Sequence, residues 1–205
     1  MIKTFLTYDE VRNNAIKLAD KIFKDGFFPD VIYVSLRGGA YLGNVISEYF
    51  KIICKNTQPP RRPVYYAAVV ARSYGDIGHS QKVSVDGWTY SPDYLRIGDK
   101  VLLVDDIFDS GQTLNYLANI ILDKGIPRSD LKIAVHDYKY FYDLKDQQPI
   151  QPDYWSRRHD LSIHQEPTWI HYLSHELVGL TTREIEKYYY SQDDALRDPM
   201  SIIEK

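Results

Sequence analysis

Hydrophobic and polar residues follow two different periods along the first two thirds of the chain. In the segment 7–26, five apolar residues recur at helical spacing and would share one face: Val11, Ala15, Leu18, Ala19 and Ile22. Thr7 and Glu10 have the spacing of a capping box, and Gly26 can end the helix. The pattern therefore predicts an amphipathic first helix.

Further along, short β-rich runs alternate with helical patterns. The runs 31–36, 64–72, 100–106 and 131–139 are typical of buried strands, and 40–51 and 111–125 are typical of helices. A polar, glycine-containing excursion fills 73–94 and includes a possible strand at 81–85. This alternation predicts an α/β fold with a mostly parallel sheet flanked by helices.

The regular pattern fades after about residue 140, where Pro149, Pro152 and Pro167 punctuate aromatic and charged stretches. We expect a small irregular subdomain there rather than another βα unit. The expected organisation is one domain over 1–205, with a core at about 27–139. A hood at about 140–180 would include part of the N-terminus, and a C-terminal helix would cover about 181–197.

Composition and charge exclude several classes of function. The 205 residues carry a formal net charge of -3, which gives no general signal for nucleic-acid binding. Cys54 is the single cysteine, so no intramolecular disulfide can form. No apolar run approaches the length of a membrane span, and acidic residues come too early for a secretory signal. We therefore expect a cytoplasmic protein without a membrane or nucleic-acid partner.

The clearest chemical signal is the stretch "VLLVDDIFDSGQTL", where a buried-looking strand ends in a group of carboxylates. Asp105 and Asp106 follow four apolar residues directly, and Asp109 comes three residues later. Like charges this close repel one another, so a cation or an electron-poor ligand is expected beside them.

The residues behind these acids favour phosphate binding. Ser110 and Thr113 supply hydroxyl donors, Gly111 admits a close approach to the backbone, and a helix begins here. In a parallel sheet, ligands bind beyond the carboxyl ends of the strands. A phosphate cradle beside carboxylates suited to hydroxyls or a divalent cation indicates a phosphorylated sugar as ligand.

This stretch resembles the phosphoribosyl-pyrophosphate (PRPP) signature of type I phosphoribosyltransferases. Two rival interpretations were weighed: a plain Mg²⁺ site, as in hydrolases or receiver-like domains, and the DDxxD diphosphate motif of prenyl-chain enzymes. The DDxxD motif lies within a helix of an all-α protein, whereas "VLLV" is β-like and Gly111 follows closely. The phosphoribosyltransferase resemblance is therefore favoured.

The resemblance implies a role for each matching position. Asp105 and Asp106 would bind the ribose hydroxyls directly or through Mg²⁺, and Asp109 would be the acid/base group near the purine N7. Four residues would hold the 5-phosphate of PRPP: Ser110, Gly111, Gln112 and Thr113.

Two further segments match the same family. The end of "VSLRGG" resembles its pyrophosphate loop, which often contains a cis peptide bond before the basic residue. The matching residues are Leu36, Arg37, Gly38 and Gly39. Arg37 would stabilise the leaving pyrophosphate. Ser73 and Tyr74 stand where relatives begin a catalytic loop that closes over the reacting centre.

The acceptor base has to be inferred from later residues. Lys139 lies where the 6-oxopurine branch of the family contacts the exocyclic O6, and Trp169 and Ile170 match its stacking ring and its backbone contact. An acid often follows the tryptophan by about six residues, but His175 stands there, with Glu176 next as a weaker candidate metal ligand. The remaining histidines show no standard zinc spacing and are interpreted as structural or surface residues.

The resemblance thus implies a purine phosphoribosyltransferase that uses PRPP, Mg²⁺ and hypoxanthine, guanine or xanthine, in a homodimer or homotetramer. Two alternatives remain open. One is a transferase for adenine or a pyrimidine, and the other is a PRPP-sensing regulator of the same fold that binds nucleic acid.

Overall fold

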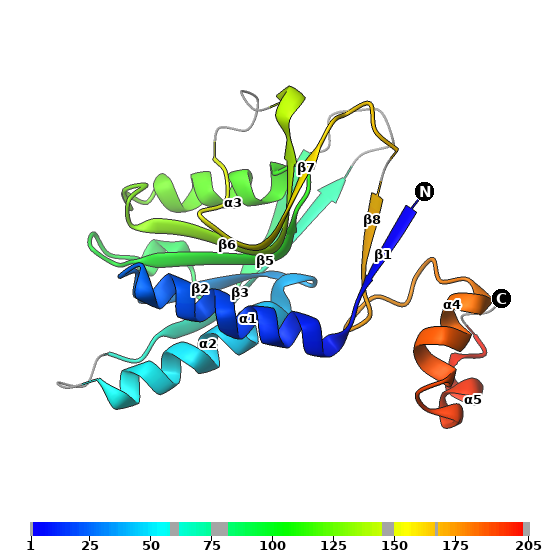
Figure 1. The fold of residues 1–205 in the computed structure, drawn as a ribbon. Helices are drawn as coiled ribbons and strands as arrows, with labels where there is room; N and C mark the ends of the chain where they lie inside the picture. The colour runs from blue at the N-terminus through cyan, green and yellow to red at the C-terminus, as the bar shows by residue number, and fades with distance from the viewer. Residues whose placement is uncertain (1, 58–61, 75–81, 145–149, 167, 203–205) are drawn as a thin grey trace. The chain divides into compact units, whose positions relative to one another are not determined.

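The structure is a computed structural model that describes residues 2–57, 62–74, 82–144, 150–166 and 168–202 (Figure 1). The chain divides into two compact units. The larger unit is Val11–Gln165, and the smaller unit combines Met1–Glu10 with Glu166–Lys205. No described helix has the length and apolar character needed to cross a membrane.

The larger unit is built on a six-stranded sheet with the strand order β4-β3-β2-β5-β6-β7. Five strands run parallel to their neighbours: β2 (Val31–Leu36), β3 (Tyr65–Tyr74), β5 (Val101–Phe108), β6 (Leu131–Phe141) and β7 (Tyr154–Leu161). β4 (Lys82–Trp88) is antiparallel to β3 and closes one edge. The predicted α/β class with a mostly parallel sheet is confirmed.

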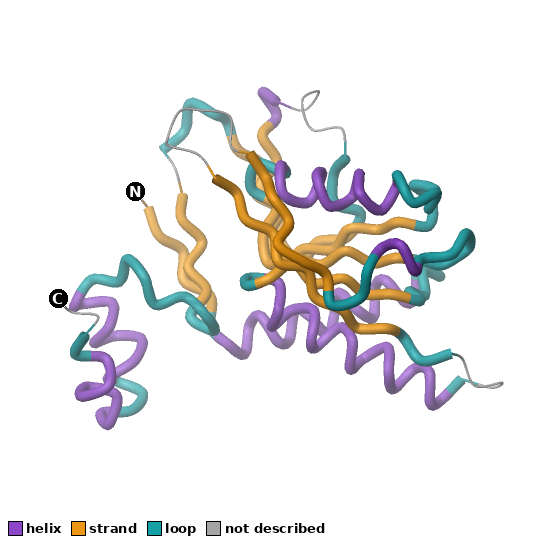
Figure 2. Tube along the Cα trace, turned by 180° about the vertical axis from the view of Figure 1, so that it is seen from behind, coloured by secondary structure: helices purple, strands orange, loops and turns teal. Residues whose placement is uncertain are grey.

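Helices cover both faces of this sheet, as Figures 1 and 2 show. α1 (Tyr8–Lys24) and α2 (Gly39–Asn56) pack on one face, and α3 (Gln112–Leu122) packs on the other. The five apolar residues predicted to form one face of the first helix are the ones that α1 buries. Thr7 and Glu10 exchange the capping-box hydrogen bonds. Periodicity and capping were therefore sufficient to place α1.

The alternation of side chains slips by one residue in the two neighbouring strands β5 and β6. In β5, Leu103 lies in the core under α3, and so does Phe108, although strict alternation would place Phe108 on the opposite face. In β6, Val135 and Tyr138 show the same change of parity. Within the described strands, the ladder from β5 to β6 has no pairing between positions 106 and 136, where the slip falls. Two successive residues of each strand thus point to the same face near the carboxyl ends.

Two short helical segments complete the larger unit. η1 (Pro92–Tyr94) follows β4, and η2 (Tyr142–Leu144) follows β6. The strand β7 was not expected from the sequence, because its residues 156–160 are all polar or charged. These side chains are tolerated because the strand lies at the edge of the sheet and its charged groups find partners.

The smaller unit contains a two-stranded parallel sheet of β1 (Ile2–Leu6) and β8 (Thr168–Tyr172). Where one helix was expected at about 181–197, the chain forms α4 (Thr182–Ile185), a π-helical turn (Glu186–Tyr190), a 3₁₀ turn (Asp194–Leu196) and α5 (Arg197–Met200). Ile185, Tyr190 and Met200 form its buried cluster. The helix breaks because the Asp193 carboxylate accepts the Ala195 N–H at 3.0 Å and so starts a new turn.

Candidate functional site

The loop between β5 and α3 forms an open pocket at the carboxyl edge of the sheet. The pocket has a volume of about 240 Å³ and is lined by Asp105 and residues 107–114. α3 begins at Gln112 without a side-chain cap, and its first turn holds no acidic residue. The first-turn N–H groups of a helix have no partner within the helix. This loop can therefore bind an anionic group such as phosphate.

Gly111 makes this loop possible. It has a φ of 76°, in the left-handed region that favours glycine, and it directly precedes α3. A Cβ atom here would collide with the ring of Phe108, which is buried in the core below. Backbone conformation and packing both require glycine at this position.

A second loop, between β2 and α2, lies against the acid pair, which is Asp105 and Asp106. The peptide bond between Leu36 and Arg37 is cis, as the family resemblance implied, and the Arg37 side chain is exposed. A Cβ atom on Gly38 would collide with the Asp106 carboxylate. One on Gly39 would lie 2.8 Å from the Asp105 Cα and 2.9 Å from the Val104 carbonyl oxygen. The two glycines thus allow both candidate phosphate-binding loops to meet at the carboxylates.

Burial and the repulsion between the two carboxylates both disfavour a negative charge on Asp105. Burial raises the pKa of Asp105 well above its ordinary value, and the neighbouring charge of Asp106 raises it further. Asp105 Oδ1 accepts the Asp106 N–H at 3.0 Å, and Asp106 Oδ1 accepts the Ile107 N–H at 2.9 Å. An arriving cation would relieve the repulsion between the two carboxylates.

This donor set fits Mg²⁺ in the way that phosphate-dependent sites use it. Mg²⁺ is usually bound by one or two carboxylates together with substrate phosphates and water, not by a complete protein cage. Within the described ranges, no group of three or more His, Cys, Asp or Glu side chains gathers to hold a metal. Asp105 and Asp106 could therefore hold Mg²⁺ together with the oxygens of a phosphorylated substrate.

Lys139 and Asp109, which sequence reasoning placed in one site, form an ion pair. Their Nζ and Oδ2 atoms are 3.1 Å apart, and the Lys139 side chain is largely buried while that of Asp109 is exposed. Lys139 comes from β6, and Asp109 comes from the loop after the adjacent strand β5. The pair thus presents a cation and a carboxylate side by side at the edge of the pocket.

The two candidates for the start of a catalytic loop belong to a strand of the larger unit. Ser73 and Tyr74 end β3, where their backbones pair with Val83 and Lys82 of β4, and their side chains lie outside the described part of the structure. Residues 75–81 of the predicted excursion also lie outside it. The proposed role of this segment therefore stays a prediction.

Trp169 and Ile170 belong to β8 of the smaller unit. Trp169 is 46% exposed, whereas Ile170 is buried. In the register of the sheet, Trp169 lies beside Lys3 of β1 and Ile170 beside Thr4. The structure describes the two units separately, so their part in a base pocket stays a prediction.

His175 and Glu176 follow β8 and differ in their surroundings. The Glu176 carboxylate accepts the Tyr172 N–H at 3.0 Å and lies 3.5 Å from Nδ1 of the buried His171. The exposed His175 ring stacks on Tyr172 with centroids 5.2 Å apart. Glu176 therefore closes its own turn, and its proposed role as a metal ligand stays a prediction.

Two supporting residues were missed from the sequence. The Ser35 side chain hydrogen-bonds Asp105 and lowers its pKa, against the larger effect of burial. Asn115 donates to the carbonyl oxygens of Gly111 and Ile150, each at 2.9 Å, and so fixes the start of α3. The position of Asn115 one helical turn after Gly111 is the signal that could have revealed it.

The fold and the site together define an α/β domain with a loop suited to an anionic group at the carboxyl edge of a mostly parallel sheet. Residues 5–146 match the model of the family described as "Phosphoribosyl transferase domain". The chain belongs to this family. No curated protein matches it at the sequence level.

Solved structures share the fold at low sequence identity. The chain superposes on a purine phosphoribosyltransferase from Pyrococcus horikoshii Ot3 with a TM-score of 0.62 and 22% identity, covering 86% of this chain and 96% of the other. A hypothetical protein from Neisseria gonorrhoeae with bound ppGpp gives 0.62 and 19%, with coverages of 86% and 90%. A hypoxanthine phosphoribosyltransferase from Staphylococcus aureus gives 0.56 and 18%, with coverages of 76% and 76%.

Proposed function

We propose that the protein transfers the 5-phosphoribosyl group of PRPP to a 6-oxopurine, which is hypoxanthine, guanine or xanthine. The products would be the nucleoside 5-monophosphate and pyrophosphate, as in purine salvage. Family membership supports the transferase and its sugar donor. The purine and hypoxanthine phosphoribosyltransferases among the structural neighbours support the acceptor class at the level of the fold.

The observation that carries the choice of base is the ion pair between Lys139 and Asp109, with Nζ and Oδ2 3.1 Å apart. N7 and O6 of a 6-oxopurine are neighbouring atoms on one edge, and a lysine ammonium is a good donor to that edge. In this proposal Lys139 donates to O6, and Asp109 handles the proton at N7. Adenine carries an amino donor in place of O6, so the Lys139 cation disfavours adenine.

The sugar donor is held by the two loops that meet at the acid pair. Residues 110–113 bind the 5-phosphate, and Leu36, Arg37, Gly38 and Gly39 bind the pyrophosphate. Asp105 and Asp106 bind the ribose hydroxyls. When bound, Mg²⁺ would neutralise charge on the pyrophosphate, and the same two carboxylates are its protein ligands in this proposal.

The proposed chemistry is the exchange of one bond at C1 of the ribose. The bond from C1 to the pyrophosphate oxygen breaks, and its electron pair leaves with pyrophosphate beside the Arg37 guanidinium. N9 of the base supplies the electron pair of the new bond to C1, and Asp109 accepts the proton that the purine gives up. Ser73 and Tyr74 would begin the loop that keeps water from C1. Trp169 would stack on the base, and the Ile170 backbone would contact its edge.

The test compares hypoxanthine and adenine as acceptors in the unaltered chain and in Lys139→Gln, with PRPP and Mg²⁺ present. The unaltered chain should use hypoxanthine with a kcat/KM at least about a hundredfold above that for adenine. Lys139→Gln should lose most of this preference and keep its KM for PRPP. Equal use of the two bases by the unaltered chain would favour the alternative acceptor class. Salt-dependent nucleic-acid binding without turnover would favour the regulator.

A further inference from the structure

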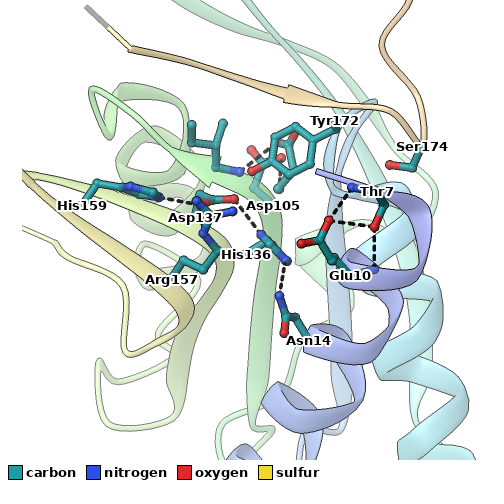
Figure 3. Close-up of polar contacts among 12 residues, drawn as sticks. Thr7, Glu10, Asn14, Asp105, His136, Asp137, Arg157, His159, Tyr172 and Ser174 are labelled. Atoms are coloured by element: carbon teal, nitrogen blue, oxygen red, sulfur yellow. Dashed lines mark hydrogen bonds and ion pairs between the residues drawn. The ribbon is translucent and has the colours of Figure 1, made fainter. Parts of the chain in front are cut away.

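A buried polar cluster lies between β6, the strand of Lys139, and β7. Its centre is Asp137 of β6, whose side chain is fully buried. Its carboxylate contacts His136 Nδ1 at 2.6 Å, His159 Nε2 at 2.6 Å and Arg157 Nε at 3.3 Å (Figure 3). A fully buried carboxylate is costly unless it is paired and hydrogen-bonded. These contacts satisfy it.

The hydrogen bonds of the cluster assign its protons. A carboxylate only accepts, so His136 Nδ1 and His159 Nε2 must both carry hydrogen. Asn14 Nδ2 of α1 lies 3.1 Å from His136 Nε2, on the far side of that ring. Arg157 already balances the charge of Asp137. The Asp137 carboxylate fixes the neutral tautomer of His159 that carries its hydrogen on Nε2.

His159 therefore presents a hydrogen-bond acceptor. With the proton on Nε2, the lone pair of the neutral ring lies on Nδ1. Among the described residues, none hydrogen-bonds that nitrogen. The His159 side chain is 24% exposed, although its Nε2 is bonded to a fully buried carboxylate. The ring is thus anchored at one nitrogen and partly open to solvent.

The position of His159 in the sheet is the decisive observation. His159 is the Cα partner of Lys139 in the parallel ladder between β6 and β7. Asp137 precedes Lys139 by two residues, so the two share a face of the sheet, and the contact between Asp137 and His159 puts His159 on that face as well. The loop after β5 and the adjacent strands β6 and β7 thus supply Asp109, Lys139 and His159 in that order.

We propose that His159 is a specificity-determining residue that accepts a hydrogen bond from N1–H of the purine, with Asp137 as the positioning residue that holds its ring. This inference rests on the proposed function. Around a 6-oxopurine, N7, O6 and N1–H follow one another, and the three side chains offer a carboxylate, a donor and an acceptor in the same order. Adenine has an unprotonated N1, so its lone pair would face that of Nδ1.

Two matched variants separate this role from simple anchoring of the cluster. His159→Asn places an acceptor oxygen near the position of Nδ1 but loses the bond to Asp137. His159→Gln keeps a donor near the position of Nε2 but loses the acceptor. Initial rates are measured with hypoxanthine and with 1-deazahypoxanthine, which has C–H in place of N1–H. The unaltered chain and both variants are compared, and PRPP binding by calorimetry serves as the folding control.

The unaltered chain should prefer hypoxanthine over the deaza analogue. His159→Gln should lower kcat/KM for hypoxanthine by about tenfold to a hundredfold and lose the preference, with PRPP binding unchanged. His159→Asn should keep most of the preference. Asp137→Asn no longer fixes the tautomer of the His159 ring. Its preference for hypoxanthine should therefore lie between those of the two His159 variants.

A preference retained in His159→Gln and lost in His159→Asn would show anchoring alone and overturn the proposal. If the unaltered chain showed no preference for hypoxanthine over the deaza analogue, that result alone would overturn the proposal. An unaltered chain that turns over no 6-oxopurine would instead overturn the proposed function, and this role of His159 with it. The two failures are therefore distinguishable.

Discussion

At the scale of single residues, the carboxylates of Asp105 and Asp109 differ in burial and in charged neighbours. Asp105 is half-buried and its pKa is raised. Both features suit its proposed role of binding a cation or the ribose hydroxyls. Asp109 is exposed and lies 3.1 Å from Lys139. The two acids therefore have different surroundings, although only four positions separate them in the sequence.

The assigned role of Asp109 predicts a selective loss of turnover on substitution. Asp109→Asn removes the proton acceptor but leaves the phosphate loop and the acid pair intact. We expect kcat to fall by about a hundredfold or more, with PRPP affinity changed by only a few fold. Steady-state kinetics combined with PRPP calorimetry measures both quantities. Undiminished turnover would rule out the acid/base role.

The contact between the two phosphate loops predicts a strict requirement for glycine. In Gly39→Ala, the new Cβ would meet backbone atoms at 2.8 and 2.9 Å that cannot move aside cheaply. We expect a loss of about 1–3 kcal/mol in the free energy of unfolding and a weaker affinity for PRPP. Gly87→Ala in β4 is the matched control, because its Cβ would meet nothing within 4 Å. Similar behaviour of the two variants in thermal unfolding and PRPP titration would contradict the packing argument.

At the scale of elements, the strand β8 contains a histidine that links stability to pH. Burial lowers the pKa of His171 below its ordinary value of 6.5, and the nearby Glu176 opposes this effect only in part. The unfolded chain therefore binds the proton more readily, and the smaller unit should lose stability as the pH falls below about 6.5. Hydrogen exchange of the β1 and β8 amides at pH 7.5 and 5.5 measures the change. His171→Gln should remove this pH dependence, and an unchanged dependence would contradict its origin in His171.

Some of the elements could be predicted from the sequence pattern, and others could not. The periodic face of α1 and the capping pair Thr7 and Glu10 were sufficient to place that helix. β7 could not be predicted because its charged residues become acceptable only beside partners on β6. The slip of side-chain alternation was equally invisible, because a period of two residues assumes an unbroken ladder.

In the candidate site, one part follows from a local sequence motif and another depends on the pairing of two strands. The acid pair and residues 110–113 are contiguous in the sequence, so a local motif was enough to place them between a strand and a helix. The cluster of Asp137 and His159 joins residues 22 positions apart and follows no metal-binding spacing. It was missed because its chemistry comes from the pairing of β6 with β7.

At the scale of the whole molecule, PRPP with Mg²⁺ should stabilise the larger unit. A ligand at a hundredfold excess over its dissociation constant adds about 2.7 kcal/mol, which corresponds to a rise of about 5–10 °C in Tm. Because the pKa of Asp105 is raised, protons compete with the cation, and the rise should increase with pH. Thermal unfolding at several pH values tests this. Asp105→Asn should flatten the pH dependence, and a ligand effect that grows toward acidic pH would contradict the assignment.

The central claim is that this chain joins the sugar of PRPP to a 6-oxopurine. The most direct measurement incubates the unaltered chain with PRPP, Mg²⁺ and each of hypoxanthine, guanine, xanthine, adenine and uracil, and separates the nucleotides formed. The predicted result is a nucleoside monophosphate from at least one 6-oxopurine, with one pyrophosphate released per nucleotide, and little or none from adenine or uracil. Binding of PRPP without nucleotide formation from any 6-oxopurine would contradict it.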